Sequence, residues 1–276
     1  MGSLENKVAF ITGAARGQGR SHACRLAEEG ADIIAIDICT AIEGMEYDGA
    51  TPADLEQTAK LVESLGRRIV TVQADVRDAQ GLKAALDQGV AELGSVDIVC
   101  ANAGILGSVP VEELTSEQWS TTIDINLTGV WNTVSAAIPH LISQGTGGSI
   151  VITSSTAGLR GLGNLAHYSA AKHGVVGLAR SLARELGPHN VRVNTVHPTA
   201  ILTDMVANKS IFRRFRPDLA DPGVDDVADL FEEMNLLPVP FVEARDISNA
   251  IAWLSSDQAR YVTGAAIPVD AGNTQK

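Results

Sequence analysis

The sequence is poor in cysteine, in aromatic residues and in basic residues. Its 276 residues include three cysteines, Cys24, Cys39 and Cys100, which match no metal-ligand spacing and cannot all pair in disulfides. We therefore expect no metal site and a reducing, cytoplasmic location. The 21 Lys+Arg stand against 33 Asp+Glu, giving a formal net charge of −12. Because binding to a phosphate backbone requires a basic surface, this balance argues against a nucleic-acid partner.

Long hydrophobic runs are also missing. No stretch approaches the roughly 20 apolar residues that a membrane-spanning helix requires. The first residues lack the basic start and apolar core of a signal peptide, and Asn6 stands where myristoylation would need Ser or Thr. We expect no membrane association. The 45% of hydrophobic residues is ample for one large core, which excludes overall disorder.

Short β-branched apolar runs alternate with segments of helical period. Strands buried on both faces are predicted at residues 8–12, 32–37, 69–74, 97–102, 149–154 and 191–197. Helices are predicted at residues 18–29, 52–65, 79–93, 118–144 and 168–186. Right-handed crossovers between such strands produce a doubly wound parallel sheet with helices on both faces, so the fold class is α/β.

Two segments interrupt this alternation. Residues 38–51 form a long acidic connection without one basic residue, and residues 203–243 mix prolines with a basic patch. Both follow strands, at the side of the sheet where open α/β folds bind ligands. We expect an insertion covering a ligand at 38–51 and a substrate lid at about 203–243, with disorder as the alternative for residues 42–51.

A glycine-rich turn joins the first predicted strand to the first helix. Gly13, Gly17 and Gly19 allow a sharp turn and close approach of a pyrophosphate to the helix N-terminus. The second strand ends in Asp37, where a carboxylate receives the hydroxyls of an adenosine ribose. Tight packing alone could explain the glycines, but the two features in this order favour a dinucleotide site.

A second group of residues follows the fifth predicted strand. Tyr168 and Lys172 lie four residues apart and so share one helix face, where the ammonium can lower the pKa of the phenol. Ser155, 13 residues earlier, ends the strand, so its hydroxyl and the phenol can converge on one carbonyl. His167 and His197 are interpreted as structural.

With these motifs the chain resembles the short-chain dehydrogenase/reductase family over nearly its whole length. The resemblance implies one NAD-binding domain of the Rossmann type over residues 1–276, with about seven strands. It implies a catalytic group of Asn126, Ser155, Tyr168 and Lys172, in which Tyr168 is the acid/base, Ser155 a hydrogen-bond donor and Asn126 the holder of a water. The cofactor residues it implies are Gly13, Arg16, Gly17, Gln18, Gly19, Asp37, Ile38, Asp75, Val76, Asn102, Ala103, Gly104, Tyr168, Lys172, Pro198, Ile201 and Thr203.

More narrowly, the chain resembles the mycobacterial carveol-dehydrogenase-like group linked to mycofactocin. The residues that carry this likeness are the glycine turn, Asp37-Ile38-Cys39, the acidic insertion and His197-Pro198-Thr199-Ala200. The likeness implies that the insertion covers bound NAD, which then exchanges slowly, while an external electron carrier of the mycofactocin kind regenerates it. The resemblance to the wider short-chain dehydrogenase/reductase family also implies a homotetramer. Asp37 favours NAD because its carboxylate would repel a 2′-phosphate, although Arg16 could pair with one.

The substrate is the least determined element. An aliphatic pocket wall is expected, and it suits a small hydrophobic secondary alcohol or ketone, terpenoid or steroid. The expected wall residues are Ile105, Leu106, Leu159, Leu162, Leu165, Ile201 and Met205. Three alternatives stay open: a polar alcohol substrate, reduction of a carbon–carbon double bond, and a catalytically silent NAD-binding regulatory protein.

Overall fold

The computed structural model describes residues 2–276 and contains a seven-stranded sheet in the order β3-β2-β1-β4-β5-β6-β7. All neighbouring strands are parallel. The strands are β1 (Val8–Thr12), β2 (Asp32–Asp37), β3 (Ile69–Gln73), β4 (Ile98–Ala101), β5 (Gly148–Thr153), β6 (Val191–Pro198) and β7 (Ala266–Val269). This architecture confirms the predicted α/β fold.

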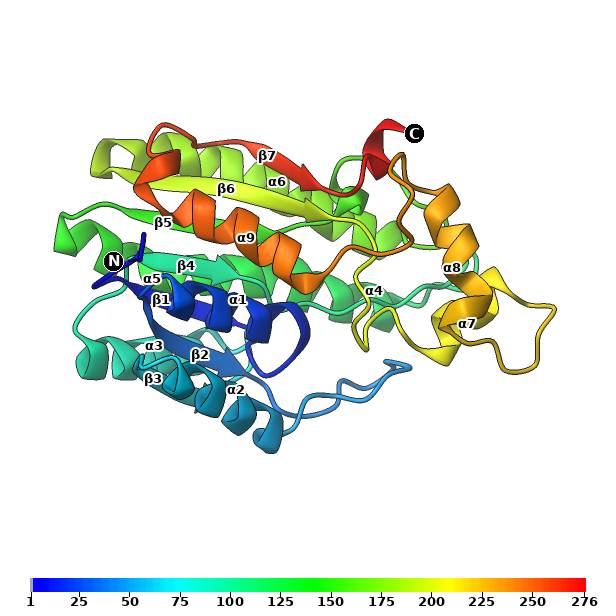
Figure 1. Cartoon of the computed structure of the whole chain (residues 1–276), viewed down its shortest axis with the longest axis horizontal. Helices are drawn as coiled ribbons and strands as arrows, with labels where there is room; N and C mark the ends of the chain where they lie inside the picture. The colour runs from blue at the N-terminus through cyan, green and yellow to red at the C-terminus, as the bar shows by residue number, and fades with distance from the viewer. Residues whose placement is uncertain (1) are drawn as a thin grey trace.

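Helices cover both faces of the sheet (Figure 1). On one face lie α1 (Gly17–Glu28), α2 (Pro52–Ser64) and α9 (Ala244–Ser255). On the other lie α3 (Ala79–Leu93), α5 (Gly129–Gln144) and α6 (Ala166–Leu186), with α4 (Ser116–Ile123) packed against α6.

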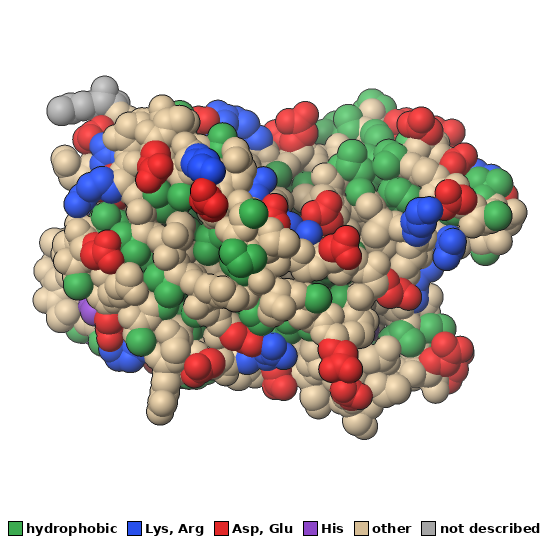
Figure 2. Space-filling model, turned by 90° about the horizontal axis from the view of Figure 1, so that it is seen from below, with side chains coloured by type: hydrophobic (Ala, Val, Ile, Leu, Met, Phe, Trp, Pro, Cys, Tyr) green, Lys and Arg blue, Asp and Glu red, His purple; other side chains and the backbone are tan. Residues whose placement is uncertain are grey.

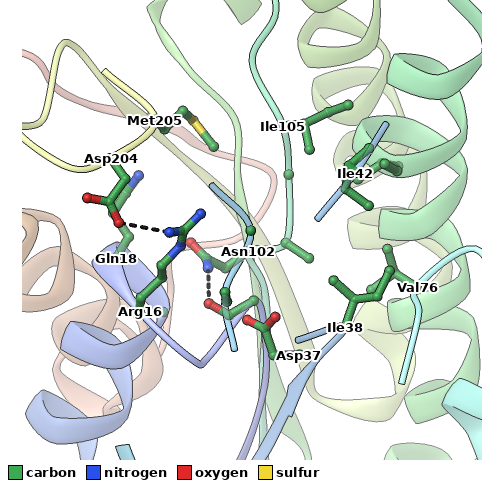
Figure 3. A pocket seen from close by; sticks show the side chains of 18 of the residues that line it. Arg16, Gln18, Asp37, Ile38, Ile42, Val76, Asn102, Ile105, Asp204 and Met205 are labelled. Carbon is green, nitrogen blue, oxygen red and sulfur yellow. Dashed lines mark hydrogen bonds and ion pairs between the residues drawn. The ribbon is translucent and has the colours of Figure 1, made fainter. Parts of the chain in front are cut away.

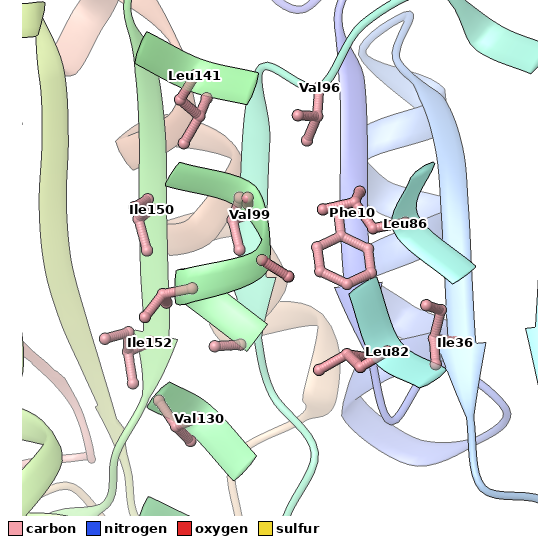
Figure 4. Packing of buried hydrophobic residues seen from close by; sticks show 14 of the residues in the cluster. Phe10, Ile36, Leu82, Leu86, Val96, Val99, Val130, Leu141, Ile150 and Ile152 are labelled. Atoms are coloured by element: carbon pink, nitrogen blue, oxygen red, sulfur yellow. The ribbon is translucent and has the colours of Figure 1, made fainter. Parts of the chain in front are cut away.

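The core therefore forms two layers, one on each side of the sheet. Successive side chains of a strand point to opposite faces, so Phe10 and Ile34 pack with one set of helices and Ile11 and Ile33 with the other. Figure 4 shows Phe10 between the sheet and Leu82 and Leu86 of α3. Burying each such side chain contributes about 1.5–3 kcal/mol, which holds the strand ends in fixed positions.

Three features differ from the expectation drawn from periodicity. The single helix expected at 118–144 is divided by a π-helical turn, Asp124–Thr128, and such turns accommodate side chains with special roles. The expected lid region contains two short helices, α7 (Lys209–Phe215) and α8 (Val224–Glu233). Helix α9 and strand β7 follow it and were not placed by the periodicity.

Residues 38–51 contain neither helix nor strand. They leave the end of β2 and return at Thr51, whose hydroxyl caps α2 in a reciprocal pair with Asp54. Figure 1 shows that this segment extends towards the segment that follows β6. The insertion thus crosses the edge of the sheet formed by the carboxyl ends of the strands.

The outer surface carries charges of both signs. In Figure 2 acidic and basic side chains are interspersed on the face shown, and no basic stripe crosses it. Within residues 2–276, no helix has the length and apolar character needed to cross a membrane.

Candidate active site

A cavity of about 180 Å³ lies at the carboxyl ends of β1, β2 and β4 (Figure 3). We call it cavity 1. Its wall brings together most of the residues expected to hold the cofactor, namely Gly13, Arg16, Gly17, Gln18, Gly19, Asp37, Ile38, Asp75, Val76, Asn102, Ala103, Gly104 and Thr203. Parallel strands end at one edge of the sheet, which is why residues so far apart in the sequence meet here.

The glycine turn presents the N-terminus of α1 to cavity 1. Gly13 and Gly17 have φ angles of 69° and 53°, which side chains rarely adopt. A Cβ on Gly19 would lie 1.9 Å from the Gly13 carbonyl oxygen, so only glycine fits this turn. Arg16, the residue before α1, makes no side-chain cap. The first N–H groups of the helix are therefore available to a phosphate.

Asp37 ends β2 at the wall of cavity 1. Its side chain is buried, and its carboxylate accepts hydrogen bonds from the backbone N–H groups of Ala15 and Cys39, both at 3.0 Å. These bonds fix the orientation of the carboxylate and leave it lone pairs for the hydroxyls of a ribose. Ile38 and Val76 add apolar side chains to the wall of cavity 1, on the same side of Asp37 in the view of Figure 3.

A second cavity, cavity 2, has a volume of about 440 Å³ and adjoins the first. The two share Gln18, Asn102, Gly104, Ile105, Thr203 and Met205. Cavity 2 brings together Ser155, Tyr168 and Lys172, and Pro198 and Ile201 also belong to its wall rather than to that of cavity 1.

Burial controls the ionisation of this group. It raises the pKa of the Tyr168 phenol to about 12, while the neighbouring Ser155 hydroxyl lowers it. Burial also lowers the pKa of Lys172 to about 8. The Lys172 ammonium stands 5.6 Å from the centre of the Tyr168 ring and donates to the Thr153 carbonyl at 2.8 Å. The spacing of Tyr168 and Lys172 predicted a lowered pKa for the phenol, whereas burial, the largest influence on it, raises this pKa.

Asn126 is fully buried on the π-helical turn. Its side chain contacts the backbone of Ile105, a residue that lines both cavities. Its amide donates to the Ile105 carbonyl at 2.7 Å and accepts from the Ile105 N–H at 2.8 Å. It lies next to Gly104, where a Cβ would be 3.1 Å from the Asn126 oxygen and 3.7 Å from Lys172 Nζ. From the π-helical turn, Asn126 thus fixes the backbone at Ile105, between the two cavities, with two hydrogen bonds.

The wall of cavity 2 includes six of the seven expected apolar residues. The expectation for Leu159 was wrong, because this side chain is 36% exposed and lies outside the cavity. The lid adds apolar residues to this wall that the sequence did not indicate, namely Val206, Ile211, Phe215, Phe231 and Met234. The amphipathic pattern of residues 224–233 was the available signal for Phe231.

The two histidines near the site differ in their surroundings. Both ring nitrogens of His197 are engaged, with the Ser155 carbonyl at 2.8 Å and the Thr195 hydroxyl at 2.7 Å, so this ring joins β5 to β6. His167 lines a third cavity of about 250 Å³ beside the insertion, and its Nδ1 has no hydrogen-bond partner within residues 2–276.

Comparison with known proteins places this arrangement among dehydrogenases. A family model described as short chain dehydrogenase matches residues 7–213. The (-)-trans-carveol dehydrogenase of Rhodococcus erythropolis is 54% identical, over 100% of both chains. The crystal structure of carveol dehydrogenase from Mycobacterium avium in complex with NAD is 57% identical, with a TM-score of 0.99 over 100% of both chains. A short chain dehydrogenase from Mycobacterium paratuberculosis, bound to NAD, is 45% identical with a TM-score of 0.92 over 100% of both chains.

The lowered pKa of Lys172 makes a prediction for the stability of the cofactor-free protein. Between about pH 8 and the ordinary lysine pKa of 10.5, Lys172 binds fewer protons in the folded state than in the unfolded state. The contribution of Lys172 to the free energy of unfolding therefore rises with pH in this window, by at most about 1.4 kcal/mol per unit. Lys172→Met should remove this rise in urea unfolding measured from pH 8 to 10.

The matched control is Lys209→Met, since Lys209 is 67% exposed on the lid and should leave the rise unchanged. Equal pH slopes in wild type and Lys172→Met would refute the assignment.

Proposed function

The chain belongs to the short-chain dehydrogenase family, and from that membership we propose that it is an NAD-dependent oxidoreductase of a secondary alcohol or ketone. The observation that carries this proposal is the meeting of Ser155, Tyr168 and Lys172 on the wall of cavity 2, which adjoins the glycine turn and Asp37 of cavity 1. NAD was expected from the sequence, and solved relatives at 57% and 45% identity contain it.

The residues of cavity 1 fit NAD. The uncapped N-terminus of α1 suits the pyrophosphate, and the oriented Asp37 carboxylate suits the ribose hydroxyls. When bound, the nicotinamide supplies the hydride chemistry. Asp75 and Val76 would hold the adenine, Asn102, Ala103 and Gly104 the middle of the dinucleotide, and Pro198, Ile201 and Thr203 its nicotinamide end.

In this proposal Tyr168 Oη exchanges the proton of the substrate hydroxyl. The Ser155 hydroxyl donates to the same substrate oxygen and stabilises negative charge on it. With a pKa of about 8, Lys172 keeps its proton at pH 7 and places a positive charge beside the phenol, which opposes the effect of burial. Asn126 positions the loop at Ile105 through its two hydrogen bonds to that backbone, and in this proposal it also holds a water near Lys172.

The substrate class we propose is a small hydrophobic alcohol such as a cyclic terpenoid. Cavity 2 is lined by aliphatic and aromatic side chains from the loop 104–106, the loop before α6 and the lid. A cavity of about 150 Å³ accommodates benzene, so about 440 Å³ has room for a substituted ring. The name of the carveol dehydrogenase of Rhodococcus erythropolis supports the same class.

Replacing the proposed acid/base tests the mechanism. Tyr168→Phe should lower kcat for oxidation of carveol by about 10²–10⁴-fold, because no other group at this position can exchange the proton. NADH binding, measured by fluorescence, should remain near the wild-type value. Tyr261→Phe is the control, since Tyr261 is 88% exposed. A Tyr168→Phe protein that kept more than about a tenth of wild-type kcat would contradict the acid/base assignment.

We further propose that residues 38–51 hold NAD tightly. Ile42, Met45 and Tyr47 line cavity 1, whereas Glu43 and Glu46 face solvent. The Tyr47 hydroxyl accepts from the Leu106 N–H at 3.2 Å, and Glu46 accepts from the Ser210 hydroxyl on the lid. These contacts join the insertion to the loop at Leu106 on one side and to the lid at Ser210 on the other. A cofactor retained in this way would require an external electron carrier, of the mycofactocin kind, to regenerate it in place.

Removing the cover tests this proposal. Gly49 lies against Thr40 and Ala41, so deleting residues 42–48 joins segments that already touch and preserves the Thr51 cap of α2. The deletion should speed NAD release several-fold in stopped-flow fluorescence, because differences in affinity lie mostly in dissociation rates. Glu43→Gln, which changes only an exposed side chain, should release NAD at the wild-type rate. An unchanged rate after the deletion would refute the cover.

A homotetramer is proposed from the surface. β7 is the last strand of the sheet and is half-exposed, and exposed edge strands favour pairing with another chain. Trp131 on α5 is 45% exposed, and Gly177 on α6 has open space beside it, whereas Ala171 faces the core. Light scattering at micromolar concentration should give four times the 28.9 kDa chain mass, and a monomeric mass would contradict the proposal.

The three cysteines are unpaired, which supports a reducing, cytoplasmic location.

A further inference from the structure

Arg16 connects three segments that are far apart in the sequence. It precedes α1 in the glycine turn, and its Nη1 lies 2.9 Å from the Asp204 carboxylate at the start of the lid (Figure 3). Its Nη2 donates to the carbonyl of Asp48 in the insertion. Both terminal nitrogens of the guanidinium are therefore committed to the two covering segments.

Because Arg16 lies beside the expected ribose site, its contacts with Asp204 and Asp48 affect the choice between NAD and NADP. Arg16 is one residue from Ala15, whose N–H donates to Asp37, and both Arg16 and Asp37 line cavity 1. An arginine near the carboxylate that receives the ribose is the ordinary partner of the 2′-phosphate of NADP. The chain thus has an arginine at the ribose end of cavity 1 that could bind NADP, but Asp204 and the Asp48 carbonyl hold its guanidinium.

We propose that Asp204 is a cofactor specificity-determining residue, which favours NAD by engaging Arg16. This inference rests on the proposed function. Asp37 would repel a 2′-phosphate, and Asp204 withdraws the cation that would attract one. The discrimination against NADP is then shared between Asp37 at a strand end and Asp204 in the lid, 167 positions further along the chain.

The size of the effect follows from exposure. The side chains of Arg16 and Asp204 are 25% and 66% exposed, so their pair is partly screened by solvent. Pairs of this kind contribute up to about 1 kcal/mol, which corresponds to about five-fold in a dissociation constant. The effect should be largest once the repulsion from Asp37 is removed, because only then can a released Arg16 meet a phosphate nearby.

Equilibrium binding of NADH and NADPH, followed by fluorescence, tests the proposal in wild type, Asp37→Ser, Asp204→Asn and the double variant. Asp37→Ser alone should improve NADPH binding relative to NADH, and the double variant should improve that ratio by about a further five-fold. Asp204→Asn alone should shift the ratio in the same direction by a smaller factor. Adding Arg16→Gln to the double variant should abolish the further gain.

Asp221→Asn is the matched control. Asp221 is 67% exposed on the lid and pairs with Lys209 at 2.7 Å, away from cavity 1. It should leave the NADPH-to-NADH ratio unchanged in either background. A residue that merely holds the lid closed would change the binding of both dinucleotides by one factor, and the ratio would stay constant.

The outcomes separate this inference from the proposed function. A double variant whose ratio equals that of Asp37→Ser would overturn the role of Asp204 and leave the proposed function standing. A wild-type protein that bound neither dinucleotide would overturn both. A gain that survived Arg16→Gln would also overturn the inference, because it would not depend on the released arginine.

Discussion

The parallel direction of all seven strands is the constraint on which the site depends. Parallel strands bring their carboxyl ends to one edge. The residues that meet there are the glycine turn after β1, Asp37 at the end of β2, Asn102 after β4 and Ser155 after β5. The two layers of buried side chains hold these strand ends against one another. A site assembled at the ends of a rigid sheet needs little further ordering when a ligand binds.

The same burial that stabilises the fold determines the electrostatics of the site. Withdrawal from water raises the pKa of Tyr168 and lowers that of Lys172, and each shift disfavours the charged form. At pH 7 the Tyr168 phenol is therefore neutral, whereas Lys172, with a pKa of about 8, still carries its positive charge. The hydrogen bonds of Asn126 to Ile105 and of His197 to Ser155 keep the surrounding backbone in place without adding charge.

The insertion (38–51) and the lid (203–243) are linked to each other as well as to the sheet. Arg16 touches both the insertion and the lid, Glu46 touches Ser210, and Tyr47 touches the loop at Leu106. After β7, Ala271 has a φ angle of 51°, a left-handed conformation that is strained for a residue other than glycine. Its carbonyl accepts from the N–H groups of Leu236 and Leu237, which anchors the lid to the chain end.

Much of this protein could be predicted from the sequence because the relevant signals are local. The alternation of strands and helices, the glycine turn, Asp37 at a strand end and the four-residue spacing of Tyr168 and Lys172 each lie within a few residues. Local patterns of this kind survive without knowledge of the fold. The positions of α9 and β7, the lid residues that complete cavity 2 and the outward direction of Leu159 depend on which segments pack together. The ionisation of Tyr168 and the engagement of Arg16 by Asp204, 188 residues away, were decided by tertiary structure alone, because desolvation and ion pairing act through space and not along the chain.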